Sequence, residues 1–157
     1  MSKSLKRVQT ALELAGVTVD IRAVDQARTA AEAAAAAGCQ LDQIAKSILF
    51  RGVQSGRVVL FLTAGGNRVD AARASAVAGE PLDKADADLV RSETGFAIGG
   101  VSPVGHLHPV RSYFDPRLND FPTIWAAAGT PRHIFAIAPT DLLRITGAIP
   151  AEFVQPS

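Results

Sequence analysis

QIAKSILFRGVQSGRVVLFLTA, residues 43–64, is the most strongly patterned stretch of the chain. Its two outer runs, QIAKSILF and RVVLFLTA, are apolar and rich in β-branched residues, as strands are. The segment between them, RGVQSG, is polar and contains two glycines, which favour a tight turn. The stretch therefore predicts a β-hairpin.

Hydrophobic periodicity and capping signals predict the remaining elements on either side of this hairpin. Further strands are expected at 17–24, 109–115, 123–129 and 132–138, and helices at 4–15, 28–38, 67–79, 84–95 and 139–148. Hairpins recur in this order instead of strict β-α-β alternation. We therefore predict an α/β (α+β) domain covering residues 1–157, in which helices flank a mixed, mostly antiparallel sheet of six strands.

Composition limits the function classes. The chain has 157 residues, is 48% hydrophobic and carries a formal net charge of +1, so a strongly basic coat for DNA is not expected. Twelve of its sixteen cations are arginine, which suits phosphate and carboxylate binding but also follows from GC-rich coding. A single cysteine, no signal peptide and no apolar run of membrane length favour a cytoplasmic protein without membrane partners.

Lys46 does not fit its surroundings. It lies within QIAKSILF, between core-type residues such as Ala45 and Ile48. A lysine there must extend to solvent, pair with an acid, or face a cleft and hold an anion. An edge strand with an exposed lysine and an anion-binding cleft both remain open.

GFAIGGVSPVGH, residues 95–106 and hereafter the glycine loop, is the second unusual feature. Gly99 and Gly100 permit a positive φ and close approach of a ligand, while Pro103 stiffens the loop. Adjacent N–H groups in such a loop can converge on one oxygen atom of a ligand. The segment has neither the phosphate-binding G-K-[ST] ending nor a dinucleotide fingerprint, and a simple tight connection is the alternative.

Other chemistry has weaker support. His106 and His108 with His133 could bind zinc, but no cysteine or glutamate spacing accompanies them, so neither a metal nor a cofactor is expected. Cys39 has no histidine nearby, and Ser102 lacks the G-x-S-x-G nucleophile elbow. A covalent nucleophile is therefore not indicated.

Four segments taken together resemble the YbaK/ProX family of aminoacyl-tRNA deacylases, which is related to the editing (insertion) domain of bacterial prolyl-tRNA synthetase. The resemblance covers residues 4–150. These segments are QIAKSILF, VVLFLTAGGNRVD, TGFAIGGVSPVGH and TIWAAAGTPRHIFAIAPTDLLRITGA. The combination of a strand lysine with a GG-x-SP-x-G loop is the specific part of the match.

The resemblance implies hydrolysis of the ester that joins a wrong, small amino acid (Cys, Ala, Ser or Thr) to tRNA, with tRNA-Pro as the expected carrier. It implies that Lys46 contacts the terminal nucleotide and that the segment from Gly99 to Pro103 positions the aminoacyl carbonyl. No protein nucleophile is established in this family; a sugar hydroxyl or the substrate's own side chain is thought to assist. Cysteine-removing members often carry glutamine where this chain has His106.

On this basis Lys46, Gly99 and Gly100 are assigned to catalysis. The substrate-binding candidates are Thr63, Ser102, Pro103, Gly105, His106, Gly129 and His133. The expected partner is mischarged tRNA, with prolyl-tRNA synthetase as a candidate second partner. A non-catalytic tRNA- or synthetase-binding module and a small-molecule phosphate-binding protein are the competing hypotheses.

Overall fold

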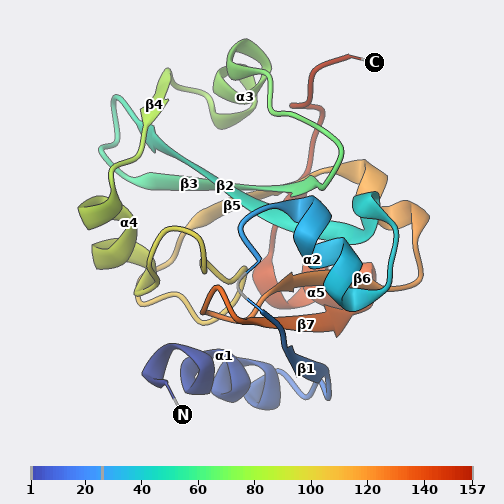
Figure 1. The fold of residues 1–157 in the computed structure, drawn as a ribbon. Helices are drawn as coiled ribbons and strands as arrows, with labels where there is room; N and C mark the ends of the chain where they lie inside the picture. The colour runs from blue at the N-terminus through green and yellow to red at the C-terminus, as the bar shows by residue number, and fades with distance from the viewer. Residues whose placement is uncertain (1, 26, 157) are drawn as a thin grey trace.

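The structure, a computed structural model, describes residues 2–25 and 27–156. Helices and strands alternate irregularly along the chain (Figure 1). The helices are α1 (Lys3–Leu14), α2 (Ala30–Ala37), α3 (Ala71–Ala78), α4 (Ala87–Thr94) and α5 (Pro139–Thr146), with 3₁₀ turns η1 (Leu41–Gln43) and η2 (Pro116–Asp120). The strands are β1 (Asp20–Ala23), β2 (Ile44–Gly52), β3 (Val58–Ala64), β4 (Leu82–Lys84), β5 (Arg111–Phe114), β6 (Ile124–Ala127), β7 (His133–Ile137) and β8 (Ile149–Pro150).

One mixed sheet organises the molecule, in the order β1-β7-β6-β2-β3-β5-β8, with β4 added to the side of β2. The predicted hairpin is confirmed, because β2 and β3 pair antiparallel with Lys46 opposite Thr63. Antiparallel pairings also join β2 to β4 and β7 to both β1 and β6, whereas β2–β6, β3–β5 and β5–β8 are parallel.

The predicted fold class is confirmed, but the predicted strand number is wrong. The described residues form eight strands where six were expected. The two missed strands, β4 and β8, are three and two residues long, too short to show an alternating pattern. Lys84 had been predicted to lie in a helix, but it pairs with Phe50 at the edge of the sheet.

Helix boundaries follow the capping signals of the sequence. Thr29 accepts a hydrogen bond from the Glu32 N–H at the start of α2, and Asp86 caps α4 in the same way. Glycines with positive φ end these helices, Gly38 after α2 and Gly95 after α4. Gly95 therefore both stops α4 and begins the glycine loop.

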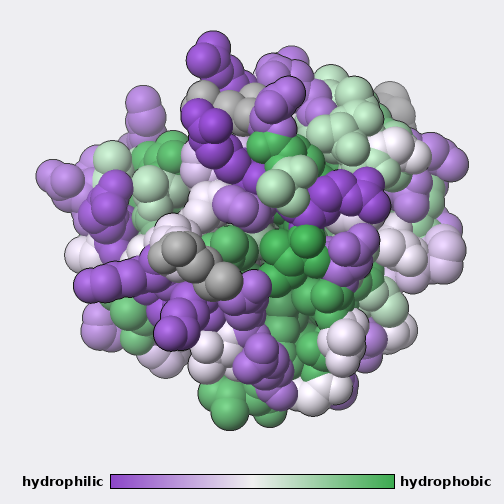
Figure 2. All heavy atoms as spheres, turned by 60° about the horizontal axis from the view of Figure 1, so that its bottom comes forward, coloured by the Kyte–Doolittle hydropathy of each residue, from purple (hydrophilic) through white to green (hydrophobic). Residues whose placement is uncertain are grey.

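The helices cover both faces of the sheet. Buried residues of α1, α4 and α5 pack with Leu60 and Leu62 of β3 on one face. On the other face, α3 packs over Val59 and Phe61, and α2 forms a separate cluster over Ile44. Figure 2, in which the α1 side of Figure 1 is turned toward the viewer, shows hydrophobic residues from the centre to the lower edge of this face, with hydrophilic residues to their left. Within residues 2–25 and 27–156, no helix has the length and apolar character needed to cross a bilayer.

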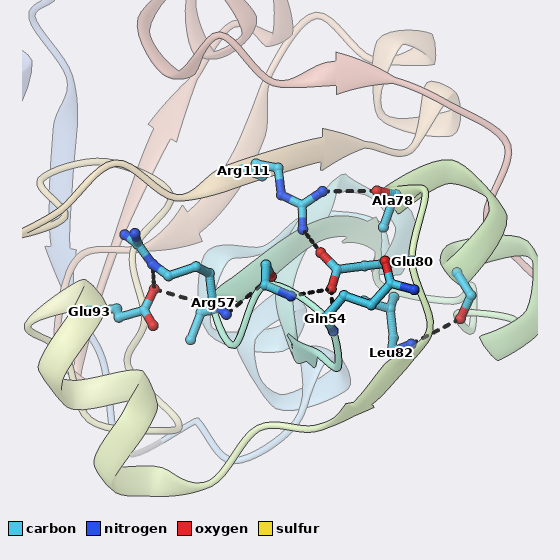
Figure 3. A network of polar contacts seen from close by, with 10 residues as sticks. Gln54, Arg57, Ala78, Glu80, Leu82, Glu93 and Arg111 are labelled. Carbon is cyan, nitrogen blue, oxygen red and sulfur yellow. Dashed lines mark hydrogen bonds and ion pairs between the residues drawn. The ribbon is translucent and has the colours of Figure 1, made fainter.

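A buried carboxylate holds the turn end of the hairpin (Figure 3). Glu80 accepts hydrogen bonds from the backbone N–H groups of Gln54 and Ser55, and Arg111 of β5 donates to its other oxygen. Arg111 also donates to the carbonyl of Ala78. These bonds, with those from Ser55 foremost, hold the pKa of Glu80 at about 2, below its ordinary value of 4.5.

We expect Glu80→Gln to lower the Tm by roughly 4–8 °C at pH 7, because the amide cannot accept all of these bonds as a carboxylate does. A depressed folded-state pKa stabilises the fold above the ordinary pKa, and this contribution is lost as the pH falls from about 4.5 to about 2. The Tm difference between wild type and variant should therefore shrink over that window. Thermal melts followed by circular dichroism from pH 7 to pH 2 measure it, with Glu13→Gln, an exposed α1 position, as the control. A Tm difference that stays constant with pH would contradict this role.

Candidate functional site

A gap in the pairing of β2 opens a cavity at one edge of that strand. On one edge of β2, Ile44 and Ala45 pair with β6 and residues 50–52 pair with β4. Residues 46–49 between them have no strand on that edge within the described part of the chain. All four of these residues line a cavity of about 450 Å³, hereafter the first cavity. Its volume is in the range of small-molecule sites, roughly 300–1,000 Å³.

Three other parts of the chain complete the walls of the first cavity. The start of α2 with the preceding residues Ala27 to Thr29 forms one wall, and Trp125, His133 and Ile134 of β6 and β7 form another. The glycine loop contributes Ile98, Gly99 and Val101. The lining is mostly apolar, so the few polar groups in it would determine how a ligand is oriented.

The packing of the two flanking helices explains the position of Lys46. Side chains alternate along β2, so Lys46 lies on the face covered by α2 and α3. Ile44 packs beneath α2 and Ile48 packs with the α3 cluster, which leaves Lys46 between the two. Its amino group donates to the Gly65 carbonyl at 3.2 Å. Lys46 is half-buried in the wall of the first cavity. The alternative of a fully exposed lysine on an edge strand is therefore excluded.

Burial lowers the pKa of Lys46, and the nearby positive charge of Arg68 lowers it further, while Asp115 and Asp42 oppose the shift. No acid lies within ion-pair distance of Lys46 among the described residues. A partly desolvated cation without a bound carboxylate is suited to an anionic or strongly polar ligand group.

Gly99 and Gly100 have different environments, although both were assigned to catalysis. Gly99 is exposed, has a φ of 97° and lines the first cavity. Gly100 is buried and is absent from the cavity wall, and its N–H donates to the Ala97 carbonyl at 3.0 Å. The Gly100 N–H is therefore not available to a ligand, because the turn from Ala97 to Gly100 uses it.

Free donors nevertheless exist in this loop. Within residues 2–25 and 27–156, the N–H groups of Gly99 and Val101 have no protein acceptor. Both residues line the first cavity. A site that offers such donors next to a cation can bind a carbonyl oxygen or an anion.

Most other substrate-binding candidates lie away from the first cavity. Thr63 is fully buried opposite Lys46, and its hydroxyl donates to the Phe61 carbonyl. Ser102 is fully buried, and its hydroxyl accepts from the Val104 N–H. Gly129 approaches the start of α1, where an added Cβ would lie 2.8 Å from the Ser4 carbonyl oxygen. Thr63, Ser102 and Gly129 therefore do not line the first cavity. Hydrogen bonds and packing within the protein occupy them instead.

Pro103, Gly105 and His106 line a different depression, the second cavity, which has a volume of about 600 Å³ and lies between the end of α1 and α5. His106 Nε2 lies 2.7 Å from the Ser102 carbonyl oxygen, so that nitrogen carries the proton. Burial lowers the pKa of His106, and Arg7 adds to the effect, while the bond to Ser102 opposes it. His106 is therefore a neutral histidine that bonds within the loop.

His133 lines the first cavity. Its Nδ1 lies 2.7 Å from the Thr130 hydroxyl, which also lines the first cavity. This bond leaves Nε2 as the ring nitrogen available to a ligand. His106 lines the second cavity and so does not share a site with His133. The described residues hold no cluster of three or more His, Cys, Asp or Glu side chains that could bind a metal.

Sequence reasoning missed Ser47, Trp125 and Arg7. Ser47 lines the first cavity and donates from its hydroxyl to the Val101 carbonyl at 2.8 Å, joining β2 to the glycine loop. Trp125 forms part of the cavity wall, and the Arg22 guanidinium lies 4.6 Å from the centre of its ring. Arg7 contacts both ends of the glycine loop from α1. Only the serine directly after an unusual strand lysine offered a signal in the sequence.

Two solved structures match nearly the whole fold of this chain, and one relative matches about three quarters of its sequence. A proposed trans-editing enzyme for prolyl tRNA synthetase is 44% identical, with a TM-score of 0.92 over 99% of each chain. A structure from the computational grafting of linear epitopes onto scaffold proteins is 42% identical, with a TM-score of 0.92 over 99% of this chain and 100% of that one. The uncharacterized protein YwhH of Bacillus subtilis is 32% identical over 73% of this chain and 72% of its own length.

A family model described as the aminoacyl-tRNA editing domain matches residues 24–145. The matched region contains Lys46, the open edge of β2, the glycine loop and both strands of the opposite wall. The chain therefore belongs to the aminoacyl-tRNA editing domain family.

Proposed function

We propose that this protein is a free-standing hydrolase that removes a small, wrongly attached amino acid from tRNA. The observation that supports this most directly is that Lys46, which carries an ammonium group, lines the same cavity as Gly99 and Val101, whose N–H groups have no protein acceptor among the described residues. A cation and free amide donors match the two ends of the reacting group, the ribose-phosphate of the terminal nucleotide and the carbonyl of the ester.

In the proposed reaction, a water molecule attacks the carbonyl carbon of the aminoacyl ester. The carbonyl oxygen gains negative charge and accepts hydrogen bonds from the free N–H groups of the glycine loop. The bond between this carbon and the ribose oxygen then breaks, and that oxygen takes up a proton. One such donor typically stabilises the transition state by roughly 3–4 kcal/mol.

The proposed reaction needs no covalent nucleophile from the protein, and the hydroxyls of Ser47, Thr29 and Thr130 in the first cavity already bond to other protein groups. The hydroxyl of Ser47 donates to Val101, and that of Thr29 accepts from the N–H of Glu32. Since an aminoacyl ester is already activated, positioning and oxyanion stabilisation supply what the reaction needs. Assistance from the ribose hydroxyl or the substrate's own side chain is compatible with this arrangement.

The apolar wall formed by Ile98, Trp125 and Ile134 would select for a small amino acid by excluding larger ones. We propose Cys, Ala, Ser or Thr as the amino acid and tRNA-Pro as its carrier, with prolyl-tRNA synthetase as a candidate partner. The similarity to a proposed trans-editing enzyme for prolyl tRNA synthetase supports this carrier.

The direct test is a panel of mischarged tRNAs, each scored for release of the amino acid above the spontaneous rate. We expect deacylation of at least one tRNA carrying Cys, Ala, Ser or Thr, and no deacylation of the same tRNA carrying Ile or Phe. Binding of tRNA without hydrolysis of any ester would instead support a non-catalytic binding module.

A further inference from the structure

Side chains from β2, from α1 and from the loop itself donate hydrogen bonds to the carbonyl groups of the glycine loop. The Ser47 hydroxyl donates to Val101, and the His106 ring donates to Ser102. Arg7 of α1 donates from Nε to the Gly105 carbonyl at 2.8 Å and from a terminal nitrogen to the Gly95 carbonyl at 2.7 Å. The loop therefore has hydrogen-bonded carbonyls at both ends and in its middle, whereas the N–H groups of Gly99 and Val101 have no acceptor among residues 2–25 and 27–156.

The two arginine bonds join points ten residues apart in the chain, the first and eleventh residues of the glycine loop. A planar guanidinium can donate to two carbonyls in fixed directions, which an ammonium group cannot do with the same geometry. The same guanidinium lies 4.5 Å from the centre of the Phe96 ring, and Phe96 is fully buried. Arg7 forms no ion pair with an acid among the described residues. The contacts that the structure shows for its side chain are those with the glycine loop.

Gly95 and Gly105, the outer glycines of the loop, leave space for Arg7 because they have no Cβ. An added Cβ at Gly95 would collide with the Arg7 guanidinium, and one at Gly105 would lie 3.2 Å from the Arg7 carbonyl oxygen. Both glycines have positive φ values, 81° and 80°. Gly95 and Gly105 therefore allow α1 to approach the loop, while Gly99 is the glycine that reaches the first cavity.

We propose that Arg7 is a positioning residue, which holds both ends of the glycine loop so that the N–H groups of Gly99 and Val101 stay available to the reacting carbonyl. This inference rests on the proposed deacylase function. Arg7 contacts no substrate in this mechanism and acts through the loop. Arg7 lies in α1, which precedes residues 24–145, the region matched by the family model. A segment outside that match therefore supports the site.

The test variants are Arg7→Met, which keeps an unbranched stem over Phe96 but no donor, and Arg7→Lys, which keeps the charge but loses the fork. We expect kcat for deacylation to fall roughly 10- to 100-fold in Arg7→Met, because small displacements of positioning groups have effects of this size. KM should stay within about threefold, since the oxyanion forms only in the transition state. Arg7→Lys should recover part of the loss. Lys6→Met, an exposed position on the same helix, is the matched control.

A second readout does not depend on activity. Amide hydrogen exchange of residues 95–106 should be faster in Arg7→Met than in wild type, while exchange in α5 is unchanged. If kcat and loop exchange both equal those of wild type, or if the loss of kcat only follows the fraction of unfolded protein, the positioning role is refuted. If the wild type hydrolyses no aminoacyl-tRNA, the proposed function fails, and loop exchange alone then decides whether Arg7 holds the loop.

Discussion

Lys46→Ala is expected to reduce kcat/KM for deacylation by roughly 100- to 1,000-fold, the size of effect seen when one preorganised polar contact is removed from an active site. The ammonium group is partly desolvated in the wall of the first cavity and is not paired with an acid within the described residues. A phosphate or ribose group of the substrate would bind this ammonium group. In the alanine variant, that phosphate or ribose has no partner.

The fold should tolerate this substitution, because among the described residues the Lys46 side chain makes a single hydrogen bond, to the Gly65 carbonyl at 3.2 Å, and this bond is half-buried. We expect the Tm to stay within a few degrees. Lys84→Ala is the matched control, since Lys84 is exposed on the neighbouring strand β4 and does not line the first cavity. Steady-state kinetics and thermal melts of both variants are the measurements. Full activity of Lys46→Ala would remove Lys46 from the site, and a large loss of Tm would give it a structural role instead.

Gly99→Ala should lower kcat by roughly 10- to 100-fold while KM changes little. Gly99 has a φ of 97°, which an alanine rarely adopts, so the loop must shift to relieve the strain. The shift moves the Gly99 N–H, and the oxyanion depends on it more than the ground state does. Because no atom lies within 4 Å of the added methyl group, backbone strain is the main direct effect of the substitution.

Gly56→Ala provides a closely matched control for this prediction. Gly56 has a φ of 71°, has no atom within 4 Å of an added Cβ, and lies in the turn of the hairpin away from the first cavity. Both substitutions should lower the Tm by a similar amount, but Gly56→Ala should leave kcat unchanged. Equal kcat values for the two variants would show that Gly99 serves only the turn.

Gly100→Ala tests a different property of the loop. An added Cβ would lie 2.9 Å from the Thr130 backbone, so this variant displaces the loop from the opposite wall of the cavity. Its effect would combine stability and turnover. Gly99 is therefore the clearer probe of the free N–H groups.

Features that depend on near neighbours along the chain could be predicted from the sequence. Alternating apolar residues predicted the β2–β3 hairpin, and the cap at Thr29 and the stop at Gly95 predicted helix ends correctly. Lys46 and Gly99 could be selected because each has the wrong residue type for its immediate surroundings, and both line the first cavity. Periodicity and capping act within a few residues, so they can be read without the fold.

Which groups of the glycine loop are left for a ligand could not be predicted in this way, because it depends on long-range packing. Arg7 reaches Gly95 and Gly105 across 88 and 98 residues of sequence, and Gly129 meets α1 instead of a substrate. Glycine has the same backbone freedom at each of these positions, so the sequence cannot separate a glycine that admits a helix from one that borders a cavity. That distinction depends on what lies opposite each backbone group, and long-range packing alone brings those partners together.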